Sequence, residues 1–380
     1  MSRQIIEIVE PGLLTTVQDR GRYGFQRFGV PVSGAFDTFA LRAANLLAGN
    51  DQGAAALELT VLGPRIKFLN DTWFALAGAD LTPTLDGLPV PSWQSIGVRK
   101  DSILSFQGAQ DGMRSYLSVA GGIDVPIVMG SRSTYTKAAM GGFEGRPLRA
   151  GDVLSSLDIP SGAEFVELKL PEDLQAPTYG HKHRVRVILG PQEEAFTSSG
   201  IDTFLNSEYT VTVQSDRMGY RMEGPVIEHV SGPDIVSDGI PLGAIQVPGD
   251  GRPIVLLTDR GTTGGYTKIA TVISTDISTF AQALPGDTIT FEAIAIEDAH
   301  AILRDQESAL LTLSRAAGIE PPKKLNIMVD GETFEVTDEK GEVIALTEST
   351  SSGNYGWNHH AKATIDGRTY EFNVQVQQVE

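Results

Sequence analysis

Residues 11–50, PGLLTTVQDRGRYGFQRFGVPVSGAFDTFALRAANLLAGN, combine two kinds of segment. The first part is polar and rich in glycine, which is typical of a loop on a rigid scaffold. In the second part, residues 37–47 repeat apolar side chains at helical spacing and predict the first helix of the chain. Ser33 or Asp37 can cap its start, and Gly49 can end it.

Outside this stretch, short valine- and isoleucine-rich runs alternate with turn pairs such as Pro64-Arg65 and Asp330-Gly331. Runs bounded in this way predict β-strands, here at residues 4–9, 65–68, 73–77, 102–106, 114–119, 152–157 and 184–189. Sequential short strands indicate antiparallel barrel or sandwich topology. We therefore expect a mainly β chain with a few helices.

A polar, proline-containing segment at residues 171–183 predicts a boundary between two β units. We expect an N-terminal β-barrel domain at residues 1–178 and a second β domain at 184–296 with one helix at 275–284. An amphipathic helix should span residues 297–318. In the remaining extension, residues 323–380, two Asp-Gly pairs predict two β-hairpins, with a loop at 353–360 between them.

Charge and composition exclude several classes of partner. The formal net charge is −18 and no run of basic residues interrupts it, so binding to nucleic acid is not expected. No apolar stretch reaches the roughly 18 residues needed to cross a bilayer, and the first residues lack the apolar core of a signal peptide. The chain has no cysteine, which is compatible with a cytoplasmic protein.

Five segments occur in the order typical of one known family. They comprise the opening run with TTVQDRGR at 15–22 and GVPVSGA at 29–35, then GSRST at 130–134, SDRMGYR at 215–221, GAIQVP at 243–248 and TGGY at 263–266. The chain thus resembles the allophanate hydrolase subunit 2 family, whose members include KipA-like proteins and the C-type subunit of 5-oxoprolinase. The resemblance implies tandem cyclophilin-like β-barrel domains, similar to the A and B parts of the carboxyltransferase region of urea carboxylase.

The resemblance also implies a function shared with a KipI-like partner subunit. Such relatives take part in ATP-dependent opening of 5-oxoproline or in carboxyl transfer from carboxybiotin to urea or a similar amide. ATP or carboxybiotin would then be supplied on another chain, with a third subunit or a biotin carrier involved. The alternative is a regulatory protein that antagonises a kinase inhibitor, as a KipA-like relative does. Because no lysine in the tail lies between two methionines, covalent biotin is not expected on this chain.

Both reactions develop negative charge, so arginines and a nearby base are the first candidates for the site. The guanidinium fork suits planar anions, which favours Arg217 and Arg221 together with the loop that carries Gln18, Asp19 and Arg20. Asp19 is the candidate base. The alternatives are that the arginines pair with acidic neighbours and that Asp19 caps a turn.

Two glycine-rich loops, at residues 246–251 and 261–268, and the loop before the first helix complete the candidates. Glycines let backbone amides approach an anion, although neither loop has the spacing of a phosphate-binding P-loop. The candidates are Ser33, Gln246, Asp250, Thr262, Thr263 and Tyr266. Simple tight turns and helix capping by Ser33 explain the same residues without a function. His181, His183, His359 and His360 are interpreted as surface side chains, and no metal is expected.

Overall fold

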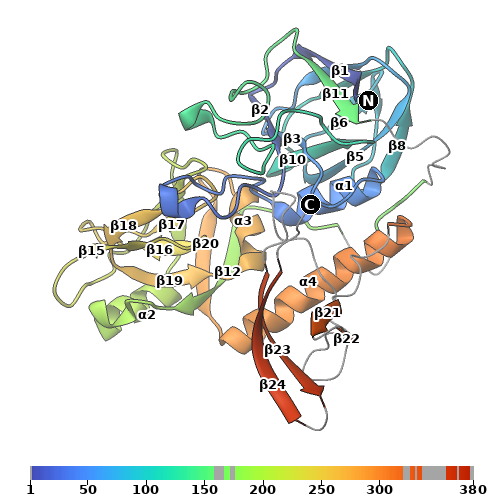
Figure 1. The fold of residues 1–380 in the computed structure, drawn as a ribbon. Helices are drawn as coiled ribbons and strands as arrows, with labels where there is room; N and C mark the ends of the chain where they lie inside the picture. The colour runs from blue at the N-terminus through green and yellow to red at the C-terminus, as the bar shows by residue number, and fades with distance from the viewer. Residues whose placement is uncertain are drawn as a thin grey trace.

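The computed structural model describes residues 2–157, 167–171, 176–319, 326–329, 332–335, 357–365 and 368–376. Its architecture is mainly β, as predicted, with two compact β units and a few helices (Figure 1). None of the helices in these ranges is long and apolar enough to cross a membrane.

The N-terminal unit consists of two antiparallel sheets packed around one apolar core. One sheet has the order β11 (Val153–Leu157), β1 (Ser2–Glu10), β4 (Arg65–Phe68), β9 (Ile103–Phe106), β6 (Pro83–Leu85) and β7 (Leu88–Pro89). The other has the order β2 (Leu14–Gln18), β3 (Ala56–Thr60), β10 (Asp111–Val119), β5 (Thr72–Asp80) and β8 (Ser95–Val98). Both sheets bury alternate side chains in the core, where the rings of Phe68 and Phe74 stack at 5.3 Å.

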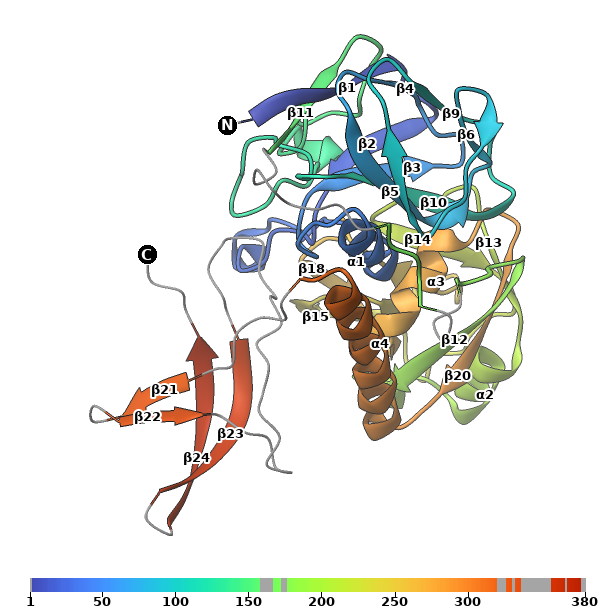
Figure 2. The same ribbon diagram turned by 90° about the vertical axis from the view of Figure 1, so that its right-hand side faces the viewer.

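Helix α1 (Thr38–Leu47) confirms the predicted first helix and packs on β5 and β10 through small side chains. Its cap is Asp37, whose carboxylate accepts a hydrogen bond from the amide of Ala40 at 2.9 Å. Ser33 was the other predicted cap, but its φ of 55° places it in a turn outside the helix. Helix α4 (Ile296–Ala316) confirms the second predicted amphipathic helix and lies against α1, as Figure 2 shows.

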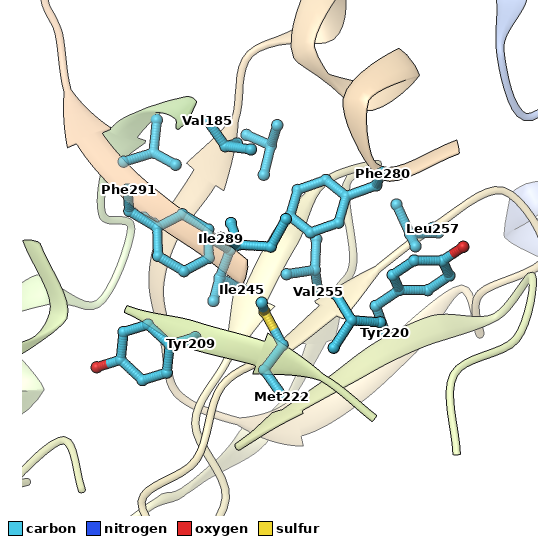
Figure 3. Close-up of a cluster of buried hydrophobic side chains, with 14 of the residues drawn as sticks. Val185, Tyr209, Tyr220, Met222, Ile245, Val255, Leu257, Phe280, Ile289 and Phe291 are labelled. Atoms are coloured by element: carbon cyan, nitrogen blue, oxygen red, sulfur yellow. The ribbon is translucent and has the colours of Figure 1, made fainter. Parts of the chain in front are cut away.

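The second unit is a closed barrel. Its strands follow the order β12 (Lys182–Leu189), β19 (Lys268–Val272), β16 (Ala244–Gln246), β17 (Ile254–Leu256), β14 (Gly219–Glu223), β13 (Tyr209–Val211) and β20 (Thr288–Ala293). A parallel pairing of β12 with β20 closes it. Aliphatic and aromatic side chains fill the barrel core (Figure 3).

Helices and a small two-stranded sheet of the barrel unit lie outside its closed sheet. Helix α3 (Ile277–Gln282) falls within the predicted helix at 275–284, after a short 3-10 turn, η4 (Ser274–Asp276). Helix α2 (Ser198–Asn206) was not predicted, because only Ile201, Phe204 and Leu205 mark its apolar side. The two-stranded sheet of β15 (Asp234–Gly239) and β18 (Thr263–Tyr266) projects from one end of the barrel.

The described tail confirms the two predicted hairpins. β21 (Asn326–Val329) pairs with β22 (Glu332–Glu335), and β23 (Trp357–Ile365) pairs with β24 (Arg368–Val376). In each case the strands are separated by the two-residue Asp-Gly sequence, which itself lies outside the described residues. The prediction of a loop was wrong for His359 and His360, which belong to β23.

The remaining short elements are 3-10 turns that shape the loops between strands. They are η1 (Gln26–Phe28), η2 (Thr136–Ala138) and η3 (Glu193–Ala195). η1 belongs to the N-terminal unit, and the segment after it reaches the barrel unit, where the amide of Ser33 donates to the carbonyl of Thr258 at 3.1 Å. The polar loop that precedes it, residues 18–22, is thereby carried to the boundary between the two units.

Candidate functional site

A buried ionic network joins the two β units around Glu58 of β3. One carboxylate oxygen of Glu58 lies 2.5 Å from Nη1 of Arg217, which comes from the barrel. The other accepts from the Tyr116 hydroxyl at 2.7 Å and from the Phe36 amide at 2.9 Å. Burial alone would raise the pKa of Glu58, but Arg217 and Arg114 outweigh it and lower that pKa. Glu58 is therefore held as a carboxylate inside the protein.

All three guanidinium nitrogens of Arg217 donate hydrogen bonds at this boundary. Its Nε donates to Asp259 at 2.9 Å and its Nη2 donates to the carbonyl of Gly34 at 2.5 Å. Burial would lower the pKa of Arg217, but Asp259 and Glu58 raise it overall. The predicted partner Arg221 is exposed on β14 and lies away from this network. The structure does not bring the two arginines into one cavity.

Arg221 instead lines a shallow surface hollow of about 200 Å³ together with Asp250 and Arg252. Asp250 is exposed, and its carboxylate accepts from the amide of Arg252 at 3.2 Å. That contact is typical of a turn residue. The hollow is therefore a polar surface feature in which Asp250 stabilises the loop between β16 and β17.

The carboxylate of Asp19 ties two of the quoted motifs together. It accepts from the Gly21 amide at 2.8 Å, the Ser131 hydroxyl at 2.6 Å, the Arg132 amide at 2.5 Å and the Ser133 hydroxyl. Both of its oxygens are thus occupied by donors within the N-terminal unit. This arrangement fixes the loop at 18–22 against the loop at 130–134.

The other predicted residues of the N-terminal unit lie on the same loops. Gln18 is buried and donates to Thr16 and to the carbonyl of Thr134. Arg20 is half-buried, and burial together with the nearby charge of Arg42 lowers its pKa. Ser33 faces the barrel, where its amide donates to the carbonyl of Thr258 at 3.1 Å.

A second polar cluster lies at the barrel end beneath β15 and β18. Gln246 on β16 and Lys268 on β19 are partners in the strand register and both are buried. The Lys268 ammonium lies 2.9 Å from the carboxylate of Asp238, whose side chain on β15 is more than half exposed. The amide of Gln246 donates to the carbonyl of Tyr266 at 3.4 Å. The cluster thus places a buried cation under a small exposed sheet.

The backbone around this cluster leaves little free space. A Cβ added at Gly264 would approach Nε2 of Gln246 to 2.8 Å, so β18 passes directly over the glutamine. Behind Lys268, the ring of His229 is 3.1 Å from the Thr267 hydroxyl and 3.1 Å from the carbonyl of Val247. We name Gln246, Lys268 and Asp238 the barrel-end cluster.

The remaining predicted residues border the barrel-end cluster. Thr263 and Tyr266 are exposed at the two ends of β18, and Thr262 is half-buried just before it. The carbonyl of Thr262 accepts from the amide of Ile240 at 3.1 Å, which joins β18 to the end of β15. Three of the predicted substrate-binding residues, Gln246, Thr263 and Tyr266, therefore lie in one region.

The two glycine-rich loops use several of their backbone amides in internal hydrogen bonds. In the loop at 246–251 the amide of Gly251 donates to Pro248 and that of Arg252 donates to Asp250. In the other loop the residues 263–266 pair with β15. A phosphate cradle needs convergent amides that are free to donate. The amides named here are used internally and are not free to bind a phosphate.

Sequence reasoning missed Lys268 and Asp238 of the barrel-end cluster. Lys268 ends the second glycine-rich loop, but a lysine in an acidic chain is usually exposed. A weak signal was present, since Lys268 is the first residue of the otherwise apolar strand that ends at Val272. Asp238 gave no signal, because β15 is exposed along most of its length.

The histidine prediction was also wrong for His183. Its side chain is buried, with Nε2 3.2 Å from Asp287, while Nδ1 of the exposed His181 lies 2.8 Å from the same carboxylate. His181 and His183 therefore stabilise the start of β12 through their contacts with Asp287. Within the described ranges, no group of three histidine or acidic side chains has the geometry of a metal site.

Similarity to known proteins identifies the family to which the chain belongs. The model of the carboxyltransferase domain, subdomain A and B, matches residues 28–293. The chain belongs to this carboxyltransferase A and B domain family. It is 40% identical over 303 residues to the C-type subunit of 5-oxoprolinase from Escherichia coli (strain K12), covering 80% of this chain and 96% of the relative. The family match begins after β1 and β2 of the N-terminal unit and extends to the end of the last barrel strand, β20.

Larger family members contain the same unit as one part. The chain is 34% identical over 323 residues to the urea amidolyase of Saccharomyces cerevisiae, covering 81% of this chain but 18% of that protein. It superimposes on the crystal structure of the K. lactis urea amidolyase with a TM-score of 0.78 and 30% identity, over 88% of this chain and 21% of that one. These relatives place the chain among the subunits and domains of multi-part enzymes.

Proposed function

We propose that this chain is the C-type subunit of an ATP-dependent 5-oxoprolinase and opens the lactam of 5-oxoproline together with a KipI-like subunit. The support is the extent of the match. The alignments cover 96% and 98% of the C-type subunits of two bacterial 5-oxoprolinases, at 40% and 36% identity. They cover 18% of each of two urea amidolyases, at 34% and 33% identity.

The observation that carries the proposed site is the buried ammonium of Lys268. In the described part of the chain, Asp238 is its one acceptor, and Asp238 lies on an exposed strand. Attack on a lactam develops negative charge on the carbonyl oxygen, and a fixed cation in a water-poor site stabilises that charge strongly. In our proposal Lys268 donates to the lactam oxygen once the substrate displaces Asp238.

Gln246 and the β15–β18 sheet have supporting roles in this proposal. The side chain of Gln246 is held by the carbonyl of Tyr266 and lies beside Lys268, where its amide positions the planar lactam group. The sheet above them carries Asp238, the carboxylate that pairs with Lys268 before substrate binds. In our proposal ATP is bound by another chain.

Carboxyl transfer is the second candidate, and one observation favours it. The matching family is described as a carboxyltransferase domain, and the superposition covers most of this chain on a urea amidolyase. A buried ammonium could equally hold the carboxyl group or the ureido oxygen during such a transfer. In this alternative carboxybiotin would arrive on a separate carrier. A regulatory antagonist of a kinase inhibitor would need no buried cation next to a buried amide.

Reconstitution distinguishes these functions. The chain is co-expressed with the KipI-like subunit and the 5-oxoprolinase A-like protein from the same genome, and the complex is isolated by size exclusion. We expect glutamate to form from 5-oxoproline only when ATP and all subunits are present. Urea carboxylation with a biotinylated carrier, in the absence of lactam opening, would establish the second candidate. Full lactamase activity of this chain alone would contradict the shared site.

A further inference from the structure

The guanidinium of Arg22 is fully buried, but only one of its three nitrogens has a hydrogen-bond partner among the described residues. Arg22 follows β2 at the boundary between the two units and is completely inaccessible to solvent. One nitrogen, Nη2, donates to the carbonyl of Ser133 at 2.5 Å. The other two, Nε and Nη1, have no hydrogen-bond partner among the described residues. Leaving charged donors unpaired in a protein interior is costly, so such groups indicate a ligand or ordered water.

The neighbouring carboxylates do not compensate this charge directly. Asp19 is the nearest in sequence, but its two oxygens already accept from Gly21, Ser131, Arg132 and Ser133. Asp259 is engaged by Arg217 on the barrel side. Burial lowers the pKa of Arg22, and Asp19 and Asp259 offset that effect only in part. The cation thus lies in an electrostatic environment that favours one additional negative charge.

Three more buried polar atoms without partners belong to the segments around Arg22. They are Oε1 of Gln18, Oγ of Ser33 and Oγ1 of Thr258. Gln18 and Arg22 are anchored to adjacent carbonyls, those of Thr134 and Ser133. The amide of Arg22 donates to Val32 at 2.8 Å, and the next residue, Ser33, donates to Thr258 at 3.1 Å. These contacts place the backbone segments that carry the four side chains next to one another.

We infer that Arg22, Gln18, Ser33 and Thr258 form a buried site for a small planar anion that carries one hydrogen-bond donor of its own. Nε and Nη1 of Arg22 bind the anionic oxygens, and the two hydroxyls add further donors. The carbonyl oxygen of Gln18 can only accept, so it requires an N–H or O–H on the ligand. Bicarbonate and a carboxylate next to an amide N–H, as in 5-oxoproline, both have this chemistry.

Thermal unfolding of the purified full chain tests the site independently of any enzymatic reaction. Melting temperatures are measured at constant ionic strength with bicarbonate, 5-oxoproline, acetate and the uncharged lactam 2-pyrrolidinone. We expect bicarbonate or 5-oxoproline to raise the melting temperature by a few degrees, in proportion to the logarithm of its concentration above Kd. Acetate, which lacks the donor, should act more weakly, and the neutral lactam should have no effect. The more effective of the first two identifies the source of the anion.

Two variants and a control locate the effect. Arg22→Met removes the cation, and Gln18→Glu supplies an internal carboxylate that pairs with Arg22; both should abolish the anion-dependent shift. Gln18→Glu should also raise the melting temperature without added anion, so it remains informative if Arg22→Met fails to fold. Arg27→Met, at an exposed arginine of η1, should behave as the unaltered chain does. Equal shifts in all four proteins would mean that the anion binds elsewhere, and no shift in the unaltered chain would mean ordered water only; either result would overturn the proposal.

Discussion

Arg217 of the barrel and Glu58 of the N-terminal unit meet at 2.5 Å across the boundary between the two β units. Their contact is part of a chain of buried partners that also includes Asp259, Tyr116 and the carbonyl of Gly34. The relative position of the two units is therefore fixed by charges that are paired only when both units are folded. This arrangement has measurable consequences for stability.

Replacing Arg217 by lysine keeps the charge but removes the fork that spans Glu58 and Asp259. We expect Arg217→Lys to lower the free energy of unfolding by about 1.5–3 kcal/mol, measured by chemical denaturation. The matched control Arg221→Lys alters an exposed arginine and should stay within about 0.5 kcal/mol. Steady-state kinetics of the reconstituted complex test the sequence-based prediction that Arg217 binds an anion. Unchanged stability with a large loss of kcat/KM would support that role instead.

Glu58 should make the protein sensitive to acid. Its folded pKa is lower than the ordinary value of 4.5, so its ionised form stabilises the fold above that pH. This stabilisation is lost as the pH falls through the lowered folded pKa. Unfolding free energy measured between pH 6 and pH 3 should therefore fall less steeply for Glu58→Gln than for the unaltered chain. An identical pH slope in both proteins would refute this role of Glu58, and exposed Glu223→Gln is the control.

Whether the sequence could predict a feature depends on how far apart in the sequence its contacting residues lie. Helix α1 was predictable because its apolar spacing and its cap at Asp37 are local signals. The Asp-Gly hairpins of the tail were predictable for the same reason. The motif around Arg217 was visible too, but its partners lie 159 and 42 residues away in the sequence. No local pattern specifies such pairs, so the arginine gave no indication of its structural partners.

The contacts of the barrel-end cluster also join residues that are distant in the sequence. Gln246 was selected because it lies in a family motif, whereas its neighbour Lys268 comes from a different strand. Only the antiparallel register of β16 with β19 places them together. Asp238 reaches Lys268 from a third segment, β15. Family motifs thus indicated the region, but only the folded structure shows that Lys268 lies at its centre.

Helix α4 should depend on one ion pair with α1. The guanidinium of buried Arg42 holds both carboxylate oxygens of Glu307, at 2.5 and 2.6 Å. Glu307→Gln should lower the free energy of unfolding by about 1–2 kcal/mol, because Arg42 loses a charged acceptor. Hydrogen exchange of residues 296–316 should become faster in the variant. Equal exchange in Glu307→Gln, unaltered protein and the exposed control Glu297→Gln would argue against this anchoring role.

We also predict that the chain carries no covalent biotin. The tail lysines Lys323, Lys324, Lys340 and Lys362 all lack the flanking methionines of a carrier lysine. An avidin blot of the protein purified from its own host should show no band at its mass, with a known biotinylated protein of that host as positive control. A band on this chain would contradict the assignment of carboxybiotin to a separate carrier.

The central claim, that Lys268 stabilises the charge developed during lactam opening, is tested most directly by kinetics of Lys268→Met in the reconstituted complex. The matched control is Lys182→Met, which removes an exposed lysine at the start of β12. We expect Lys268→Met to reduce kcat for ATP-dependent glutamate formation by about 100-fold or more while the complex still assembles. Lys182→Met should retain the activity of the unaltered complex. Unaltered kcat and KM in Lys268→Met would contradict the proposed site.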